Sequence, residues 1–323
     1  MNPLKRWRVK GLIQKALSIT PGGNHINDIL QRQLGGLKRF DENISLKVDD
    51  LIGIINLIRT TSRFDLTEAT VLEIGSGWYP TLPLCLSLLG AKKITTVDLR
   101  RHMNAGLTFR AVQSLSHHLE RVAKATDVPI ALVQDRYNTL ASCGTLDALL
   151  SAAHIEYLAP ADATRLVSIP HSTFDLVYSN SVLEHVPRDV IISMMQEASR
   201  VLKNDGLMVH AVACNDHYAH FDRSISFVNF LAFNEEQWKL WNNPIQFQNR
   251  MRAPEFLDIA RGCGFRIVHE ARAVRPGTRE ALRTMRIARE FEHFSTEDLA
   301  ATTVDFVARK DNDPALSEAP RKT

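Results

Sequence analysis

The feature that most constrains the fold is a short apolar segment ending in an acidic residue and two closely spaced glycines, Val71-Leu72-Glu73-Ile74-Gly75-Ser76-Gly77. Its apolar, β-branched start predicts a buried strand over Thr70–Ile74. Glycines let the main chain turn sharply and approach a ligand with its N–H groups exposed. A second predicted strand, Lys93–Val97, ends at Asp98, whose carboxylate can accept two hydrogen bonds from a ribose diol. The segment therefore predicts a nucleotide-type site at the carboxyl edge of a parallel sheet.

Strands and helices alternate along the middle of the chain, which favours a parallel sheet with helices on both faces. The further predicted strands are Ile155–Leu158, Phe174–Ser179, Leu207–Ala213, Phe265–Ala273 and Thr302–Ala308, with a turn at Asn204-Asp205-Gly206. Helices are predicted over Thr81–Leu89, Ala105–Lys124, Arg188–Leu202 and Pro254–Arg261, and residues 125–153 are less regular. Residues 215–252 interrupt the alternation, because they are rich in aromatic, His, Asn and Arg side chains and show no clear period.

The ends of the chain differ from its centre. Residues 1–68 predict an N-terminal helical extension, residues 69–310 one catalytic domain with 215–252 as an insertion, and residues 311–323 a disordered tail. The first twenty residues interleave basic and apolar side chains. That pattern suits a basic amphipathic helix on an anionic membrane, and it equally suits a helix packed on the protein or exposed to solvent.

Charge and cysteine usage exclude some classes of protein. The 39 Lys and Arg residues nearly balance 36 Asp and Glu residues, giving a formal charge of +3, too little for a dedicated nucleic-acid binder. The four cysteines are scattered without metal-ligand spacing, as expected for free thiols in a reducing compartment. No apolar run approaches the ~20 residues that span a bilayer. We therefore expect a cytoplasmic protein.

Two kinds of cofactor compete for the glycine turn. A dinucleotide site normally has a third glycine shortly after the second, which seats a pyrophosphate at a helix N-terminus. Here the next positions are Trp78, Tyr79 and Pro80. These bulky side chains favour a cofactor without phosphate groups over NAD.

The sequence resembles the class I S-adenosylmethionine-dependent methyltransferases over about residues 68–310. The matching segments are Glu73-Ile74-Gly75-Ser76-Gly77, Thr95-Thr96-Val97-Asp98-Leu99, Ala161-Asp162-Ala163, Phe174 to Val186, and Leu202 to Leu207. The chain departs from the family at Tyr79, where many members have a glycine. The resemblance implies an α/β fold, a Rossmann-like doubly wound seven-stranded sheet, mostly parallel with the last strand antiparallel.

The resemblance also implies which residues bind S-adenosylmethionine. Glu73 and the main chain at Gly75 and Gly77 would face the methionine portion, and Asp98 would hold the ribose hydroxyls. The remaining implied contacts are Asp162 and Ala163 at the adenine, and Ser179 and Asn180 near the sulfonium. Asp162 could also cap a helix, and His185 could either contact the site or only pack locally.

Catalysis of methyl transfer relies on proximity, because the sulfonium is already activated, and a base is needed only for a protonated nucleophile. His217 is the first candidate base and His220 the second, with Asp222 as a residue that could orient them. These residues could instead form a polar network that fixes a lid, or a metal site, although we predict no metal. Trp238 and Trp241 fit a core better than a sugar-stacking platform.

The methyl acceptor is predicted chiefly by elimination. The Asn-Pro-Pro-aromatic element of enzymes that methylate nucleic-acid amino groups is absent after Phe174–Ser179, and no cysteine stands where a nucleophile for pyrimidine methylation would. We therefore expect no DNA substrate and favour O-methylation of a small molecule, saccharide or lipid-linked intermediate, with N-methylation of a small molecule next. A non-catalytic binding or scaffold protein and an NAD-dependent oxidoreductase are the rival functions.

Overall fold

The computed structural model describes residues 6–20, 39–61 and 64–311. The predicted tail, residues 311–323, lies outside the described residues except for Asp311. Among the described helices, none has both the length and the apolar character that crossing a bilayer requires.

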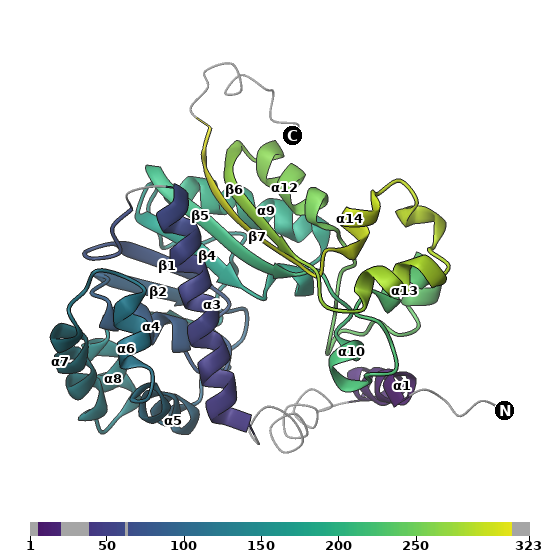
Figure 1. Cartoon of the computed structure of the whole chain (residues 1–323). Helices are drawn as coiled ribbons and strands as arrows, with labels where there is room; N and C mark the ends of the chain where they lie inside the picture. Colours follow the sequence, from purple (N-terminus) through teal and green to yellow (C-terminus); the bar gives the residue numbers. More distant parts are fainter. Residues whose placement is uncertain (1–5, 21–38, 62–63, 312–323) are drawn as a thin grey trace.

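The centre of the molecule is a seven-stranded sheet in the order β3-β2-β1-β4-β5-β7-β6 (Figure 1). The strands are β1 Thr70–Ile74, β2 Lys93–Val97, β3 Ile155–Leu158, β4 Phe174–Asn180, β5 Leu202–Ala213, β6 Phe265–Ala273 and β7 Thr303–Lys310. β1 to β5 pair in parallel, whereas β7 lies between β5 and β6 and is antiparallel to both. The predicted doubly wound, mostly parallel sheet with an antiparallel last strand is confirmed.

The predicted turn at residues 204–206 lies inside β5 and not before it. Phe174 of β4 pairs with Leu202, but Leu176 pairs with Leu207, so the residues between the two β5 partners bulge out of the ladder. A bulge of this kind keeps the chain in one strand while it takes up extra residues. The predicted turn is therefore wrong: the strand continues through residues 204–206, and the extra residues form a bulge.

Helices cover both faces of the sheet. On one face lie α3 Phe40–Thr61, α4 Thr81–Leu88, α5 Ala105–Leu115, α6 Leu119–Lys124, α7 Ile130–Ala141 and α8 Leu146–Ala152. On the other lie α9 Arg188–Val201 and α12 Ala253–Gly262. The helices α7 and α8 occupy the stretch predicted to be less regular. In α7 only Val133 and Leu140 are buried, so its sequence shows little apolar periodicity.

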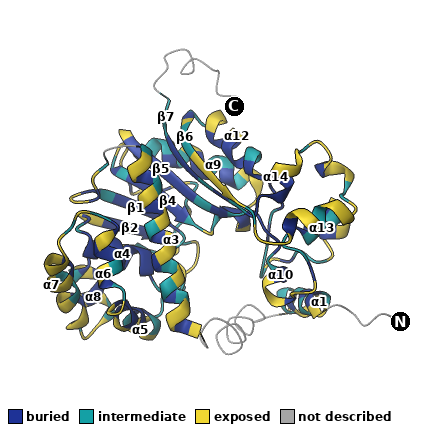
Figure 2. Ribbon diagram, in the orientation of Figure 1, coloured by how far each residue is buried: buried dark blue, intermediate teal, exposed yellow. Residues whose placement is uncertain are grey.

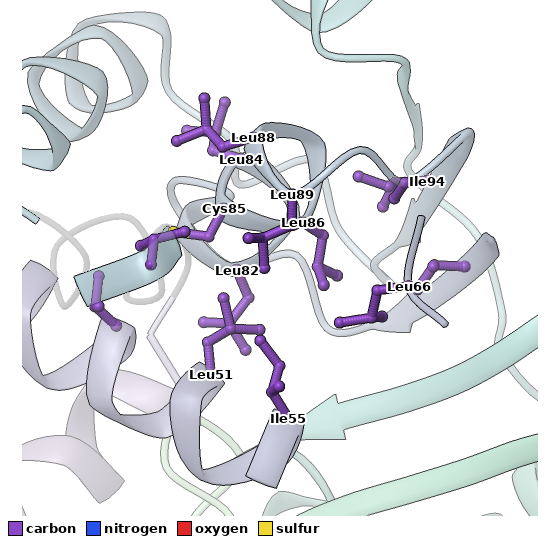
Figure 3. Close-up of a cluster of buried hydrophobic side chains, with 14 of the residues drawn as sticks. Leu51, Ile55, Leu66, Leu82, Leu84, Cys85, Leu86, Leu88, Leu89 and Ile94 are labelled. Atoms are coloured by element: carbon purple, nitrogen blue, oxygen red, sulfur yellow. The ribbon is translucent and has the colours of Figure 1, made fainter. Parts of the chain in front are cut away.

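Alternate side chains of β1 enter different cores. Val71 belongs to the core beneath α3 and α4, and Leu72 to the core beneath α9 and α12, as the two-residue period of a strand requires. Figure 3 shows Leu51 and Ile55 of α3 beside Leu82 of α4, with Leu84 and Leu88 on the far side of α4, all within the first core. Burial is accordingly concentrated in the sheet and on the inner faces of the helices (Figure 2).

A third apolar cluster joins the N-terminal helix to the insertion. Helix α1, Arg6–Ser18, lies beside α10, Tyr218–Phe221 (Figure 1). The buried Trp7 ring lies 5.4 Å from that of Tyr218 and 5.0 Å from that of Trp241. The short elements of this region are η3 Asn229–Ala232, α11 Glu235–Trp238, α13 Thr278–Thr284, η4 Arg289–Phe291 and α14 Thr296–Ala300. Trp238 and Trp241 therefore pack into a core, as predicted.

Candidate active site

A cavity of about 790 Å³ opens at the carboxyl ends of β1, β2 and β4. Such an edge is where open α/β sheets bind ligands. Seven of the eight predicted cofactor residues line it, namely Glu73, Gly75, Gly77, Asp98, Asp162, Ala163 and Asn180. Segments more than a hundred residues apart in sequence thus come together around one space.

The glycine turn after β1 requires glycine for two reasons. Gly75 and Gly77 have φ values of +94° and +62°, in the left-handed region that other residues rarely adopt. A Cβ on Gly75 would also lie 2.4 Å from Cγ2 of Val182. The turn therefore packs closely against the segment that follows β4, and this contact positions the cavity wall.

Asp98 is held at the end of β2 by main-chain donors. The N–H of Gly77 donates to its Oδ2 over 3.1 Å, and the N–H of Arg100 donates to its Oδ1 over 3.2 Å. Each carboxylate oxygen can accept more than one hydrogen bond. The carboxylate is therefore oriented and keeps capacity for two ligand hydroxyls.

Asp162 caps a turn and not a helix. Its Oδ1 accepts hydrogen bonds from the N–H of Thr164 over 2.9 Å and from Oγ1 of Thr164 over 2.7 Å. These bonds favour the ionised form and lower the pKa of Asp162. Residues 163–172 contain no helix, so the capping alternative applies to a turn. The same residue also lines the cavity beside Ala163.

Glu73 lies at the end of a chain of hydrogen bonds beneath the cavity. Oγ1 of Thr96 donates to its Oε2 over 2.5 Å, and the hydroxyl of Tyr178 donates to its Oε1 over 2.9 Å. Because Thr96 gives its proton to Glu73, Ser76 must donate in the 2.6 Å bond between Ser76 and Thr96. Burial is the main cause that raises the pKa of Glu73 to about 7, and the charge of Lys47 opposes this increase.

Ser179 is the predicted cofactor residue that the structure does not place on the cavity wall. Its side chain is fully buried, and its Oγ shares a 2.7 Å hydrogen bond with Nδ1 of His210 in β5. Its neighbour Asn180 does line the cavity and donates from Nδ2 to Asp50 of α3 over 3.0 Å. Successive residues of a strand point to opposite faces, which explains the difference.

The turn that follows β4, η2 Leu183–His185, carries two titratable side chains beside the cavity. His185 lines the cavity, and its Nδ1 lies 2.8 Å from the carbonyl oxygen of Phe247. Glu184 is 1% exposed. Asn249 fixes the turn, because its Nδ2 donates to the carbonyls of Leu183 and Val186 over 2.7 and 2.8 Å.

The predicted catalytic histidines lie just beyond this turn. The ring centroid of His217 is 4.9 Å from that of His185 and 6.0 Å from that of His220. Nε2 of His220 lies 2.9 Å from Oδ1 of Asn215. Asp222 accepts hydrogen bonds from main-chain groups: its Oδ2 accepts from the N–H of Trp7 over 3.1 Å and its Oδ1 from the N–H of Ser224 over 3.0 Å.

Much of the polar insertion has a structural role. Arg252 is 0% exposed, and its guanidinium donates to main-chain carbonyls that include those of Cys214 and Ala301. Arg250 is also buried and pairs with Glu235 and Glu290. These bonds satisfy buried charge and hold the insertion against η4 and α14.

Sequence analysis missed two residues of this region. Lys47 lines the cavity from α3, far from the glycine turn in sequence, and nothing in its local pattern indicates a site. Glu184 stands in the segment Val182-Leu183-Glu184-His185-Val186. An acidic residue in a largely apolar segment indicates a buried carboxylate, so the sequence contained a signal for Glu184.

Comparison with known proteins agrees with this geometry. A family model described as a methyltransferase domain matches residues 51–270, which is more than half of the chain. The chain therefore belongs to this methyltransferase family. No curated protein matches it.

The fold is also similar to those of solved methyltransferases. One is an S-adenosylmethionine dependent methyltransferase from Mesorhizobium loti, with 15% identity, a TM-score of 0.40, and coverage of 78% of this chain and 95% of that one. Another is geranyl diphosphate C-methyltransferase from Streptomyces coelicolor A3(2), with 13% identity, a TM-score of 0.43, and coverage of 82% and 80%. That structure contains Mg²⁺, geranyl diphosphate and S-adenosyl-L-homocysteine.

The cofactor of this protein is S-adenosylmethionine. The cavity fits it in three respects: a cradle at Gly75 that a side chain would fill, an oriented carboxylate at Asp98, and no built site for a pyrophosphate where Trp78 and Tyr79 stand. The protein is a methyltransferase that uses this cofactor.

Proposed function

We propose that the protein O-methylates a small molecule, a saccharide or a lipid-linked intermediate. The observation that carries this proposal is the grouping of histidines where the cavity meets the insertion. His185 stands in the cavity wall, with His217 behind it and His220 next to His217. A hydroxyl nucleophile must lose a proton when it is methylated. In the proposed complex, these histidines lie close enough to the acceptor to take up that proton.

In the proposed complex, the predicted contacts other than Ser179 keep their roles. Asp98 holds the ribose hydroxyls, Asp162 and the N–H of Ala163 hold the adenine, and the glycine turn together with Glu73 and Asn180 surrounds the methionine portion. S-adenosylmethionine supplies an activated methyl group when bound. The chain's own contribution is to orient donor and acceptor in line and to exclude water.

We assign the general-base role to His217 first and to His220 second. Burial is the main cause that lowers the pKa of His217 to about 3, with smaller contributions from His185 and His220. The imidazole is therefore neutral at pH 7, but it is a weak proton acceptor on its own.

We further propose that the insertion, residues 215–252, covers the acceptor side of the catalytic domain, residues 69–310. Helix α1 of the N-terminal extension, residues 1–68, holds the insertion through Trp7, whereas α3 of the same extension packs over the sheet. The four cysteines are free thiols, which supports a cytoplasmic location.

The outer face of α1 supports contact with a membrane. Leu12 and Ile13 of α1 are 50% and 52% exposed, whereas Trp7, Gly11 and Gln14 of the same helix are buried, and Ile19 just after the helix is 83% exposed. Apolar and basic side chains on one helix surface favour binding to anionic lipid, which suits a lipid-linked acceptor. Co-sedimentation with phosphatidylglycerol vesicles tests this contact. We expect binding that is lost in the variant Leu12→Glu/Ile13→Glu, and binding unchanged in that variant would refute it.

The function is tested by calorimetric titration with S-adenosylhomocysteine, followed by an acceptor screen with a labelled methyl donor. We expect saturable binding of S-adenosylhomocysteine and none of NADH, and transfer of label to hydroxyl-bearing acceptors. Label on nitrogen of amine acceptors alone would replace O-methylation by N-methylation. Binding with no transfer to any acceptor would favour the non-catalytic scaffold, and binding of NADH alone would favour the oxidoreductase.

A further inference from the structure

Three side chains beside the cofactor cavity converge in the way metal ligands do. Glu184, His185 and His217 each present a ligand atom, and these atoms all lie within 4.8 Å of one another. Bonds of about 2.1 Å to one ion bring ligand atoms to within about 4.2 Å of each other at most, so small side-chain movements complete the set. Neighbouring strands of the sheet supply the ligands, since Glu184 and His185 follow β4 and His217 follows β5.

The carboxylate of Glu184 lacks any partner that would explain its burial. The side chain is 1% exposed, and neither carboxylate oxygen makes a hydrogen bond of normal geometry. A buried carboxylate without a hydrogen-bond partner is costly, and a cation bound to it would remove that cost.

His185 is held in the tautomer that a ligand needs. A carbonyl oxygen can only accept, so Nδ1 of His185 carries the proton and donates to Phe247 over 2.8 Å. The lone pair of Nε2 is then available. A histidine ligand that donates its other ring N–H to a main-chain carbonyl is the usual arrangement around protein-bound metals. Asn249 secures the same turn through its hydrogen bonds to Leu183 and Val186.

We propose that Glu184, His185 and His217 form a binding site for a divalent transition-metal ion at the acceptor end of the cofactor cavity. Two imidazoles and one carboxylate suit zinc, iron(II), cobalt(II) or nickel(II) better than Mg²⁺ or Ca²⁺, which prefer oxygen ligands. Three protein ligands leave positions open for another molecule. Because His185 is part of the cavity wall, those positions are within reach of an acceptor in the cavity.

The ion identifies a class of acceptor, and this step rests on the proposed O-methylation. A molecule with two adjacent oxygen atoms, such as an ortho-diol or an α-hydroxycarbonyl compound, can occupy two open positions at once. Binding to the cation lowers the pKa of the hydroxyl, and its proton leaves to solvent, so in the metal-bound site His217 acts as a ligand and not as the general base. The oxygen then attacks the methyl carbon, a C–O bond forms, and the S–CH₃ bond breaks with its electron pair passing to sulfur.

Titration of the untagged full chain with cobalt(II) tests the site without reference to activity. We expect one saturable equivalent with visible d–d absorption and a rise in Tm. Glu184→Gln and His217→Gln should each weaken binding by more than about tenfold. The exposed His117 and Glu236 provide matched controls, since His117→Gln and Glu236→Gln should leave it unchanged.

Folding and function are separated by two further measurements. Without metal, Glu184→Gln should be at least as stable as the parent, because it removes a buried carboxylate, so a weaker metal response cannot be ascribed to unfolding. Titration with S-adenosylhomocysteine reports the cofactor site independently. Equal cobalt binding by the parent and Glu184→Gln, or no saturable binding by the parent, would overturn the metal site even where S-adenosylhomocysteine binds normally.

Discussion

The main-chain N–H of Gly77 donates a 3.1 Å hydrogen bond to the carboxylate of Asp98. This bond joins the glycine turn after β1 to the end of β2, so the two parts of the cofactor site that lie twenty-one residues apart are fixed to each other. Asp98 consequently serves both the ligand and the turn that faces the ligand. Replacement of the Asp98 side chain should therefore weaken cofactor binding more than it destabilises the sheet.

Asp98→Ala should weaken the binding of S-adenosylhomocysteine by about 1.5–3 kcal/mol, the scale of a lost hydrogen bond to a charged group. Calorimetric titration measures the change. Asp127→Ala, at an exposed carboxylate paired with Arg59, is the matched control and should bind as the parent does. Unchanged affinity in Asp98→Ala would remove this residue from the site.

The two glycine positions Gly75 and Gly53 should respond to alanine in opposite directions. Gly75→Ala places a Cβ 2.4 Å from Val182 at a φ of +94°, so we expect the protein to lose both stability and cofactor affinity. Gly53 lies inside α3 with no atom within 4 Å of the added Cβ. Gly53→Ala should therefore stabilise the fold by roughly 0.5–1 kcal/mol. Chemical denaturation gives both values, and equal effects would contradict the close packing of the turn.

The affinity for S-adenosylhomocysteine should rise with pH near neutrality. The pKa of Glu73 is raised to about 7 by burial, so the carboxyl is largely protonated at pH 6. A cationic ammonium group nearby favours the ionised form, and binding at low pH must first expel the proton. We expect up to about tenfold tighter binding at pH 8 than at pH 6. Glu73→Gln should bind more weakly and show no such dependence, whereas an equal pH response in that variant would assign the effect to another group.

His217→Ala should cut turnover while leaving the affinity for S-adenosylhomocysteine nearly unchanged, because His217 does not line the cofactor cavity. Steady-state rates with an acceptor found in the screen, together with calorimetry, separate the two quantities. Loss of cofactor binding in this variant would show instead that His217 supports the cavity through His185.

The fold could be predicted from the sequence because its signals are local. Each strand of the parallel region is a short apolar run followed by a turn, and Glu73, Gly75 and Asp98 stand at strand ends where the pattern itself indicates a ligand. The helices α7 and α8 escaped prediction because few of their side chains are buried. Their apolar periodicity is therefore too weak to read.

Most of what the sequence did not predict depends on contacts between distant segments. Lys47 lines the cavity from α3, and Asp222 accepts a hydrogen bond from the N–H of Trp7, 215 residues away. The convergence of Glu184 with His217 likewise depends on the pairing of β4 with β5. Spacing along the chain cannot report such contacts, although a single acidic residue in an apolar segment does indicate where to look.

The contribution of His210 to the stability of the fold should decline as the solution becomes mildly acidic. His210 is 2% exposed, and burial lowers its pKa to about 3. In the unfolded chain the same ring takes up a proton below about pH 6.5, while the folded state does not. Protonation of this ring therefore stabilises the unfolded state as the pH falls from 6.5 toward 3, and the contribution of His210 to the stability of the fold declines. His217, with a pKa also lowered to about 3, acts in the same direction, whereas the raised pKa values of Glu73 and Glu184 act oppositely.

Comparison with His210→Asn isolates this contribution from the other groups. Between pH 7.5 and 5.5 the change in unfolding free energy should be about 1.4 kcal/mol less favourable for the parent than for the variant. The variant's own stability at pH 7.5 need not match the parent, because the measured quantity is the difference in slope. Denaturant titrations at both pH values provide it, with the exposed-site variant His117→Asn expected to retain the parental slope. Parallel pH profiles for the parent and His210→Asn would mean that the His210 ring is protonated in the folded protein despite its burial.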